Sequence, residues 1–179
     1  IQEFLLSRLK KGQVLGIDGM VTAAETVLDM ETAFSAQGIG IRSEDLITPI
    51  WTDRPSIPQS PVDLLPEQYT GLSAAEKIAQ VRSRLKENGA DAMAVTRLES
   101  IAWVLNLRAS DVVYNTSFVS YVLLTQETAV LYVDSSRVSE EGLDYLKKNG
   151  VAVRPYGEIL DGIAAIDVPT VMLVSVENV

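Results

Sequence analysis

The sequence predicts an α/β fold with a mixed β-sheet that carries helices on both faces. Short apolar segments rich in β-branched residues alternate with helical segments along most of the chain, an order typical of α/β domains. Between residues 117 and 133, two such apolar segments are separated only by the polar turn 125–128. That spacing predicts an antiparallel hairpin, so the sheet should be mixed rather than purely parallel.

Residues 1–48 predict a first unit in which two helices alternate with two short strands. Thr22 and Glu25 have the spacing of a capping box at the start of the second helix, and Gly38 stands where a glycine ends a helix. The expected elements are a helix over 1–10, a strand over 14–17, a helix from 22 to the cap at 38, and a strand over 39–41.

Residues 49–66 hold five of the seven prolines of the chain. Each proline removes a backbone donor and fixes φ, so neither a helix nor a central strand can run through the segment. We interpret it as a semi-rigid linker between two units. The alternative is a long surface loop within one domain.

Residues 67–179 predict the second unit. Ser73 and Glu76 form a second capping-box pattern before an apolar stripe at helical spacing. That helix should end at Asn88-Gly89. The expected strands are 91–96, 117–124, 129–133, 151–154 and 170–174, and the further expected helices are 100–107, 139–148 and 156–164.

Composition excludes several classes of function. With 24 acidic and 15 basic residues the net charge is −9, which disfavours a general nucleic-acid binder, since such proteins need a basic surface. The apolar runs are too short for a membrane span, so no membrane partner is expected. The absence of cysteine fits a reducing compartment, and we expect a cytoplasmic location.

The chain contains neither histidine nor cysteine. A Ser-His-Asp or Cys-His hydrolase cannot be built from it, and a metal site would need carboxylates alone. The acidic residues near the N-terminus favour a solvated helix face over a metal site, and the glycines near them complete no phosphate-binding motif. We therefore expect no catalytic residue and no metal ligand here. The acidic residues are Asp18, Glu25, Asp29 and Glu31, and the glycines are Gly16 and Gly19.

One polar group stands out between the helix ending near residue 107 and the strand starting near 117. It consists of Arg108, Asp111, Tyr114 and Asn115, and loops at such junctions often carry function. Arginine can hold a carboxylate through two parallel hydrogen bonds. The alternative is a local Arg108–Asp111 pair with Tyr114 against the core. For Trp103, core packing is the favoured interpretation.

The same segment resembles the middle domain of the three-domain Xaa-Pro aminopeptidases, in the creatinase/prolidase group of metallopeptidases. That family shows the block L-D-E-I-A-W-L-L-N-L-R-G-x-D followed by Y-N-P-x-F-x-S-Y. The matching residues here are 98–111, 114–115 and 118–121, with similar blocks at 12–18, 50–55 and 71–82. Among the departures, Ala109 replaces the family's glycine, which suggests that the backbone there does not need positive φ.

The resemblance implies a non-catalytic region, made of the end of a first creatinase-N-like domain and a second one. The longer enzyme would remove an N-terminal residue that precedes proline. Two divalent metal ions, expected to be manganese, would be bound in a C-terminal catalytic domain absent here. Peptides with a penultimate proline and a second copy in a homodimer are the implied partners. Arg108, Tyr114 and Asn115 are the implied substrate-cleft candidates.

Two other interpretations stay open: a free-standing binding module with this fold, and part of a prolidase or creatinase relative. The incomplete first unit also predicts exposed apolar surface around Ile1, Leu5 and Val14.

Overall fold

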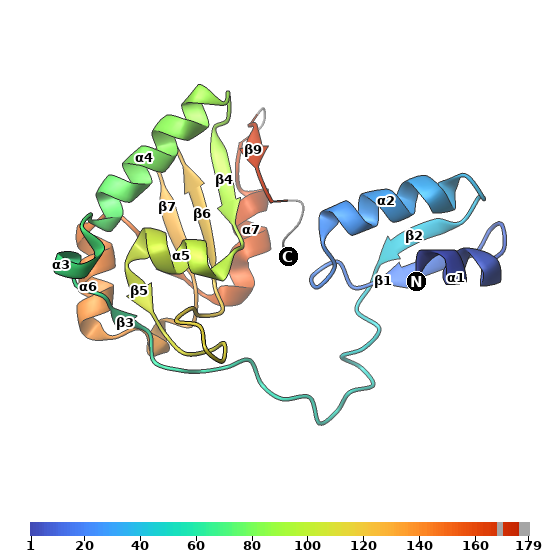
Figure 1. The fold of residues 1–179 in the computed structure, drawn as a ribbon, viewed down its shortest axis with the longest axis horizontal. Helices are drawn as coiled ribbons and strands as arrows, with labels where there is room; N and C mark the ends of the chain where they lie inside the picture. The colour runs from blue at the N-terminus through green and yellow to red at the C-terminus, as the bar shows by residue number, and fades with distance from the viewer. Residues whose placement is uncertain (168–169, 176–179) are drawn as a thin grey trace. The chain divides into compact units, whose positions relative to one another are not determined.

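The computed structural model describes residues 1–167 and 170–175. The chain forms two compact units, residues 1–56 and 57–175, which divide inside the proline-rich segment (Figure 1). No helix in the described ranges is long and apolar enough to cross a bilayer.

The first unit pairs two short parallel strands and adds two helices. Val14 pairs with Gly40 and Ile17 with Ser43. Its elements are α1 (Gln2–Arg8), β1 (Val14–Ile17), α2 (Ala24–Ser35) and β2 (Gly40–Ser43). Gly38 has φ +69° just after α2, as the glycine pattern predicts. Phe34 and Ile39 are its buried apolar side chains. Ile1 and Val14 are exposed as expected, whereas Leu5 is half-buried.

The capping box predicted at Thr22 and Glu25 is wrong. Helix α2 begins after Ala23, and no side chain caps its first amides. The Thr22 hydroxyl donates instead to the carbonyl of Asp18, 2.7 Å away. A tight turn after β1 competes for the hydroxyl that the spacing assigned to the helix.

The second unit is built on a five-stranded mixed sheet in the order β8-β7-β6-β4-β9. The central β6 pairs antiparallel with β4 and β7, whereas β8 and β9 each pair in parallel with their neighbours. The strands are β4 (Ala92–Val95), β6 (Tyr121–Thr125), β7 (Ala129–Tyr132), β8 (Ala152–Arg154) and β9 (Met172–Leu173).

Helices lie on both faces of this sheet, which confirms the predicted fold class. Strand β6 sends Val122 and Leu124 into the larger core and Leu123 into the smaller one on the opposite face. Helices α4, α5 and α6 contribute to the larger core and α7 to the smaller (Figure 1). They are α4 (Ala74–Glu87), α5 (Leu98–Leu105), α6 (Glu140–Lys148) and α7 (Ile159–Ala164).

The end of the predicted linker belongs to the second unit. Strand β3 (Asp63–Leu64) pairs antiparallel with β5 (Leu107–Arg108), and Val62 is fully buried in the larger core. A short helix, α3 (Glu67–Thr70), follows. Proline excludes strands only where its missing N–H is needed, so Pro61 and Pro66 can flank a short edge pairing.

Several boundaries differ from the predicted ones. The helix expected to reach Leu107 ends at Leu105, because Asn106 adopts a left-handed conformation and the chain enters β5. The strand expected from Ser117 begins at Tyr121. The predicted helix 156–164 starts with a 3₁₀ turn, Tyr156–Glu158. The Ser73–Glu76 capping box is confirmed, with both reciprocal bonds present.

Candidate functional site

The distinctive block 98–121 is organised around the carboxyl end of helix α5. Its last carbonyls accept from two cationic side chains: Lys77 Nζ lies 2.8 Å from the Trp103 oxygen, and Arg108 Nη1 lies 2.6 Å from the Ala102 oxygen. Cations are favourable at this end of a helix because its free carbonyls carry partial negative charge. The two side chains therefore hold the turn into β5.

Lys77 is the centre of a buried polar network. Its side chain is 1% exposed, and Nζ also donates to Asn106 Oδ1 at 2.5 Å. The Asn106 amide in turn donates to the carbonyl of Leu72 and to the hydroxyl of Tyr145. Burial, with the nearby charge of Arg108, lowers the pKa of Lys77, since both disfavour the ammonium form.

Arg108 points toward the body of its own unit. Its Nη1 donates to the Leu107 carbonyl as well as to Ala102, and burial lowers the pKa of its guanidinium. The local Arg108–Asp111 pair, which the sequence left as an alternative, is wrong. Asp111 pairs with Arg137 instead, at 2.6 and 2.7 Å from one guanidinium nitrogen to both carboxylate oxygens.

The Asp111–Arg137 pair is deeply buried, with side-chain exposures of 0% and 5%. Burial opposes ionisation of Asp111, but hydrogen bonds from Arg137, Ser60 and Val119 outweigh it, and the pKa of Asp111 is lowered. Burying a charge costs free energy unless the charge is paired and fully hydrogen-bonded. Here every oxygen of the carboxylate has a donor.

The loop that follows Asp111 carries the other two predicted site residues. Tyr114 has φ +62° and is 106% exposed, so it does not cover the core as the alternative supposed. Asn115 Nδ2 donates to Glu99 Oε1 at 2.8 Å, which ties the loop to the first turn of α5. Ala109 does not have positive φ, as its replacement of glycine suggested.

Trp103 departs from the expectation of core packing, because its side chain is 49% exposed. Lys77 Nζ lies over the ring, 4.5 Å from its centroid, which is a cation–π contact. The neighbouring Ile101 and Leu105 fill the core instead.

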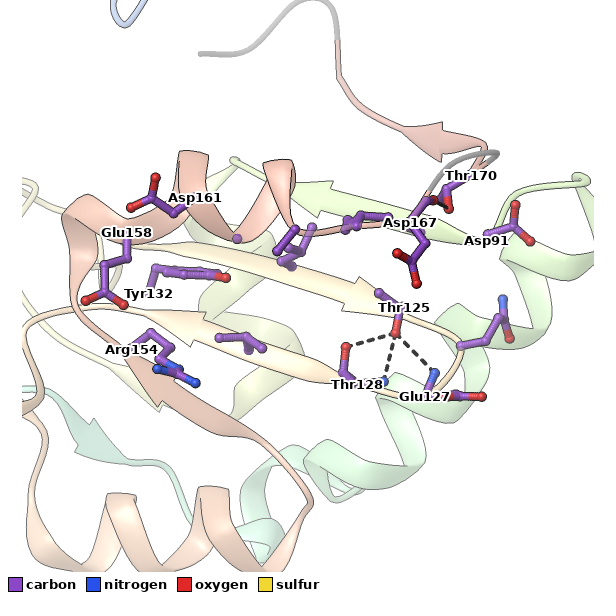
Figure 2. Close-up of a pocket in the computed structure, with 17 residues that line it drawn as sticks. Asp91, Thr125, Glu127, Thr128, Tyr132, Arg154, Glu158, Asp161, Asp167 and Thr170 are labelled. Carbon is purple, nitrogen blue, oxygen red and sulfur yellow. Dashed lines mark hydrogen bonds between the residues drawn. The ribbon is translucent and has the colours of Figure 1, made fainter.

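A cavity of about 740 Å³ lies on the opposite face of the sheet, beside α7. Figure 2 shows Glu158 and Asp161 at one end and Asp91 and Asp167 at the other, with Tyr132 between the sheet and the helix. At the hairpin end, the Thr125 hydroxyl accepts from the amides of Glu127 and Thr128 (Figure 2). Helix α7 contributes Asp161 and Gly162 to the lining of this cavity.

Neither place gathers a metal-binding cluster among the residues that the structure describes. Within the ranges that the structure describes, no three acidic residues lie close enough together to hold a metal ion, and the whole sequence lacks imidazole and thiol ligands. A pair of metal ions needs several converging carboxylate or imidazole donors. The described residues of this chain do not bring such donors together.

Comparison with known proteins places this geometry in a family. The sequence profile of the creatinase/prolidase N-terminal domain matches residues 53–179. The chain belongs to this family. A creatinase/prolidase N-terminal domain is therefore the structural context of the α5 block and its loop.

Curated relatives agree with this assignment. The chain is 34% identical over 159 residues to a probable Xaa-Pro aminopeptidase P of Chaetomium globosum, covering 87% of this chain and 26% of the relative. A protein of the same description from Tuber melanosporum is 36% identical over 167 residues, covering 90% and 27%. The chain thus spans about a quarter of the length of these relatives.

A solved structure is also similar. The X-prolyl aminopeptidase of Caenorhabditis elegans, described as a cytosolic enzyme with a di-nuclear active site, superposes with a TM-score of 0.85 and 29% identity. The match covers 92% of this chain and 27% of that one.

Sequence reasoning singled out the loop as a candidate but missed most of the residues that support it. Arg137, Ser60 and Glu99 lie far from their partners in the sequence, so no local pattern connects them. Lys77 did leave a signal: it stands three residues after Ala74 and four before Val81, on the apolar side of a helix. A lysine there needs a buried partner.

Proposed function

We propose that this chain is the non-catalytic N-terminal and middle region of an Xaa-Pro aminopeptidase, and that loop 108–120 borders the substrate cleft of the longer enzyme. The observation that carries the proposal is the exposure of Tyr114 at a positive φ. Its ring is fully exposed on a loop that is fixed from within, at a backbone angle unfavourable for a non-glycine residue. Strained, exposed and rigidly supported positions are typical of binding sites.

The longer enzyme would act on peptides with a penultimate proline, using two divalent metal ions, manganese by our expectation, in a catalytic domain outside this chain. Homodimer formation and a cytoplasmic location complete the proposal. The names of the relatives favour this function over that of a prolidase or creatinase relative. A free-standing binding module is the competing interpretation, and a reading frame that ends at residue 179 would support it instead.

Within the site, the three candidates have different roles. Tyr114 is the residue we assign to direct contact with the peptide or with the cleft wall. Asn115 holds the loop against Glu99, and Arg108 holds the carboxyl end of α5. Both therefore shape the border of the cleft, and their removal should also disturb the fold of the loop.

The test is a set of substitutions in the full-length enzyme, assayed with an Xaa-Pro peptide. We expect Tyr114→Ala to lower kcat/KM roughly tenfold, the size of one lost aromatic contact. Tyr69→Ala is the matched control, since Tyr69 is an exposed tyrosine on α3. Arg108→Ala should lower both kcat/KM and stability. Unchanged kinetics for Tyr114→Ala would contradict the cleft assignment.

A second measurement addresses the catalytic role. The 179-residue chain, supplied with manganese, should show no turnover of the same peptide. Turnover by this chain would contradict the proposal that its function is non-catalytic.

A further inference from the structure

Ser60 makes an unusual number of hydrogen bonds for a residue in a proline-rich segment. Its amide and hydroxyl donate to Asp111 Oδ1, at 3.2 and 2.5 Å. Its carbonyl accepts from Nε and Nη2 of Arg137, at 3.1 and 3.0 Å. Its hydroxyl also accepts from the amide of Ser110 at 3.0 Å. One residue at the end of the linker therefore contacts two elements distant in sequence.

The same network fixes both ends of the candidate loop. Ser110 is held by the Ser60 hydroxyl at one end, and the amide of Val119 donates to Asp111 Oδ2 at 2.8 Å at the other. Tyr114 and Asn115 lie between these two anchors. Neighbouring Val62 extends the attachment, since its amide and carbonyl bond to Arg137 and Ser139.

We propose that Ser60, Asp111 and Arg137 form a positioning clamp that joins the end of the proline-rich linker to the loop carrying Tyr114 and Asn115. The clamp makes the orientation of Tyr114 depend on the path of the linker. Pro61 directly follows Ser60 and restricts its backbone, so a displacement of the linker at Ser60 is transmitted to Asp111 rather than absorbed locally. This inference rests on the proposed function of the loop.

Core stability alone does not explain such a network. Buried ion pairs are often replaceable by apolar side chains without loss of stability, and their best-attested use is to specify one arrangement. The positive φ of Tyr114 also persists only if the surroundings enforce it. The clamp contributes to this enforcement by anchoring both ends of the loop, at Ser110 and Val119, with charge-assisted bonds to Asp111.

The first test measures amide hydrogen exchange in the 179-residue chain. Ser60→Ala removes the hydroxyl but keeps the backbone bonds, and we expect the amides of Ser110 and Val119 to exchange roughly tenfold faster. Strand β6 should exchange as in the unchanged chain. Ser60→Thr, which retains a hydroxyl, should restore slow exchange, and Ser56→Ala is the control from the same proline-rich region.

Two results would overturn the clamp. One is unchanged exchange at both Ser110 and Val119 in the Ser60→Ala chain. The other is an equal increase across β6, which would make Ser60 a contributor to general stability. Asp111→Asn provides an independent check, since it should accelerate the exchange of Val119, and slow exchange there would also contradict the clamp.

The second test is kinetic and uses the full-length enzyme. Because this chain holds no catalytic group by our proposal, Ser60→Ala should raise KM roughly fivefold for an Xaa-Pro peptide, with kcat nearly unchanged. Ser60→Thr should restore KM. If Tyr114→Ala changes KM but Ser60→Ala does not, the clamp fails and the proposed function stands. If neither Tyr114→Ala nor Ser60→Ala changes KM, although the loop amides exchange faster in the Ser60→Ala chain, the function proposed for the loop is wrong. The clamp would then have no role in positioning a substrate contact.

Discussion

The two units follow the same alternation of helices and strands but differ in how completely their sheets are covered. In the second unit a five-stranded sheet has an apolar core on each face, the larger including Phe118 and Leu124 and the smaller including Leu123 and Ile159. In the first unit two parallel strands are accompanied by only two buried apolar side chains, Phe34 and Ile39. Parallel strands are normally covered on both faces, and an isolated two-stranded sheet is marginal.

The difference shows that alternation in sequence specifies elements, whereas stability depends on the number of strands that share a core. Many large apolar side chains of the first unit are exposed, among them Ile1, Phe4, Leu28 and Ile50. We therefore expect the first unit to unfold before the second. The chain carries one tryptophan in each unit, Trp51 and Trp103, so replacing either one with phenylalanine leaves a reporter for the other unit.

The largest expected effect is the removal of a core side chain. Phe118 is fully buried in the larger core, and Phe118→Ala should lower the unfolding free energy of the second unit by about 3–5 kcal/mol. Denaturant unfolding followed by Trp103 fluorescence in a Trp51→Phe background measures it. Phe34→Ala should leave this transition in place. A shift of the Trp103 transition by Phe34→Ala would contradict this expectation.

A slightly smaller effect is expected from the buried ion pair. Asp111→Asn leaves Arg137 without its counter-charge and should cost about 3 kcal/mol near neutral pH. The pKa of Asp111 in the folded chain is lowered from its ordinary value of 3.8. The ionised carboxylate therefore stabilises the folded state fully above that pH. This stabilisation is lost as pH falls through the lower folded-state pKa.

Urea unfolding across pH measures this effect. The difference in unfolding free energy between the unchanged chain and the Asp111→Asn variant should be constant near neutrality. It should become smaller only below pH 3.8. Asp144→Asn on α6, an exposed aspartate, is the control. If this difference did not depend on pH in the acid range, the charge of Asp111 would contribute nothing to the stability of the fold.

An intermediate effect is expected where α7 meets the sheet. A Cβ added at Gly162 would lie 1.9 Å from the hydroxyl oxygen of Tyr132. Gly162→Ala should therefore cost about 1–3 kcal/mol through displacement of that ring, and adding Tyr132→Phe should recover part of the loss. Gly157→Ala is the matched control, because a Cβ there meets no atom within 4 Å. Equal thermal stability of the two alanine variants would refute this explanation.

The smallest expected loss of stability comes from substitutions at the two predicted capping boxes, one in each unit. Glu76 accepts from the amide and hydroxyl of Ser73, so Glu76→Ala should cost about 1 kcal/mol. Glu25 also lies in the first turn of its helix but takes part in no capping box. Glu25→Ala should therefore cost about 0.5 kcal/mol or less. Unfolding followed by the tryptophan of each unit gives both values, and equal losses would contradict the assignment.

Much of the fold could be predicted because it depends on local patterns. The apolar stripe of α4, the glycines after α2, α4 and α6, and the hairpin of β6 and β7 each follow from neighbouring residues. The false capping box at Thr22 shows where this reasoning fails, since Asp18, four residues upstream, competes for the same hydroxyl. The sequence singled out the loop containing Tyr114 as a candidate, which stays a prediction, but it did not reveal the distant residues that hold this loop.

By itself the sequence determined the order of the elements, the mixed character of the sheet, and the absence of imidazole and thiol chemistry. Only the tertiary structure decided that Asp111 pairs with Arg137, 26 residues away, and with Ser60, 51 residues away. It also decided that Trp103 is half exposed and that Lys77 is buried. Local patterns fix backbone conformation within a few residues. The partner of a buried charge, by contrast, depends on which distant segments the packed core brings within hydrogen-bonding distance.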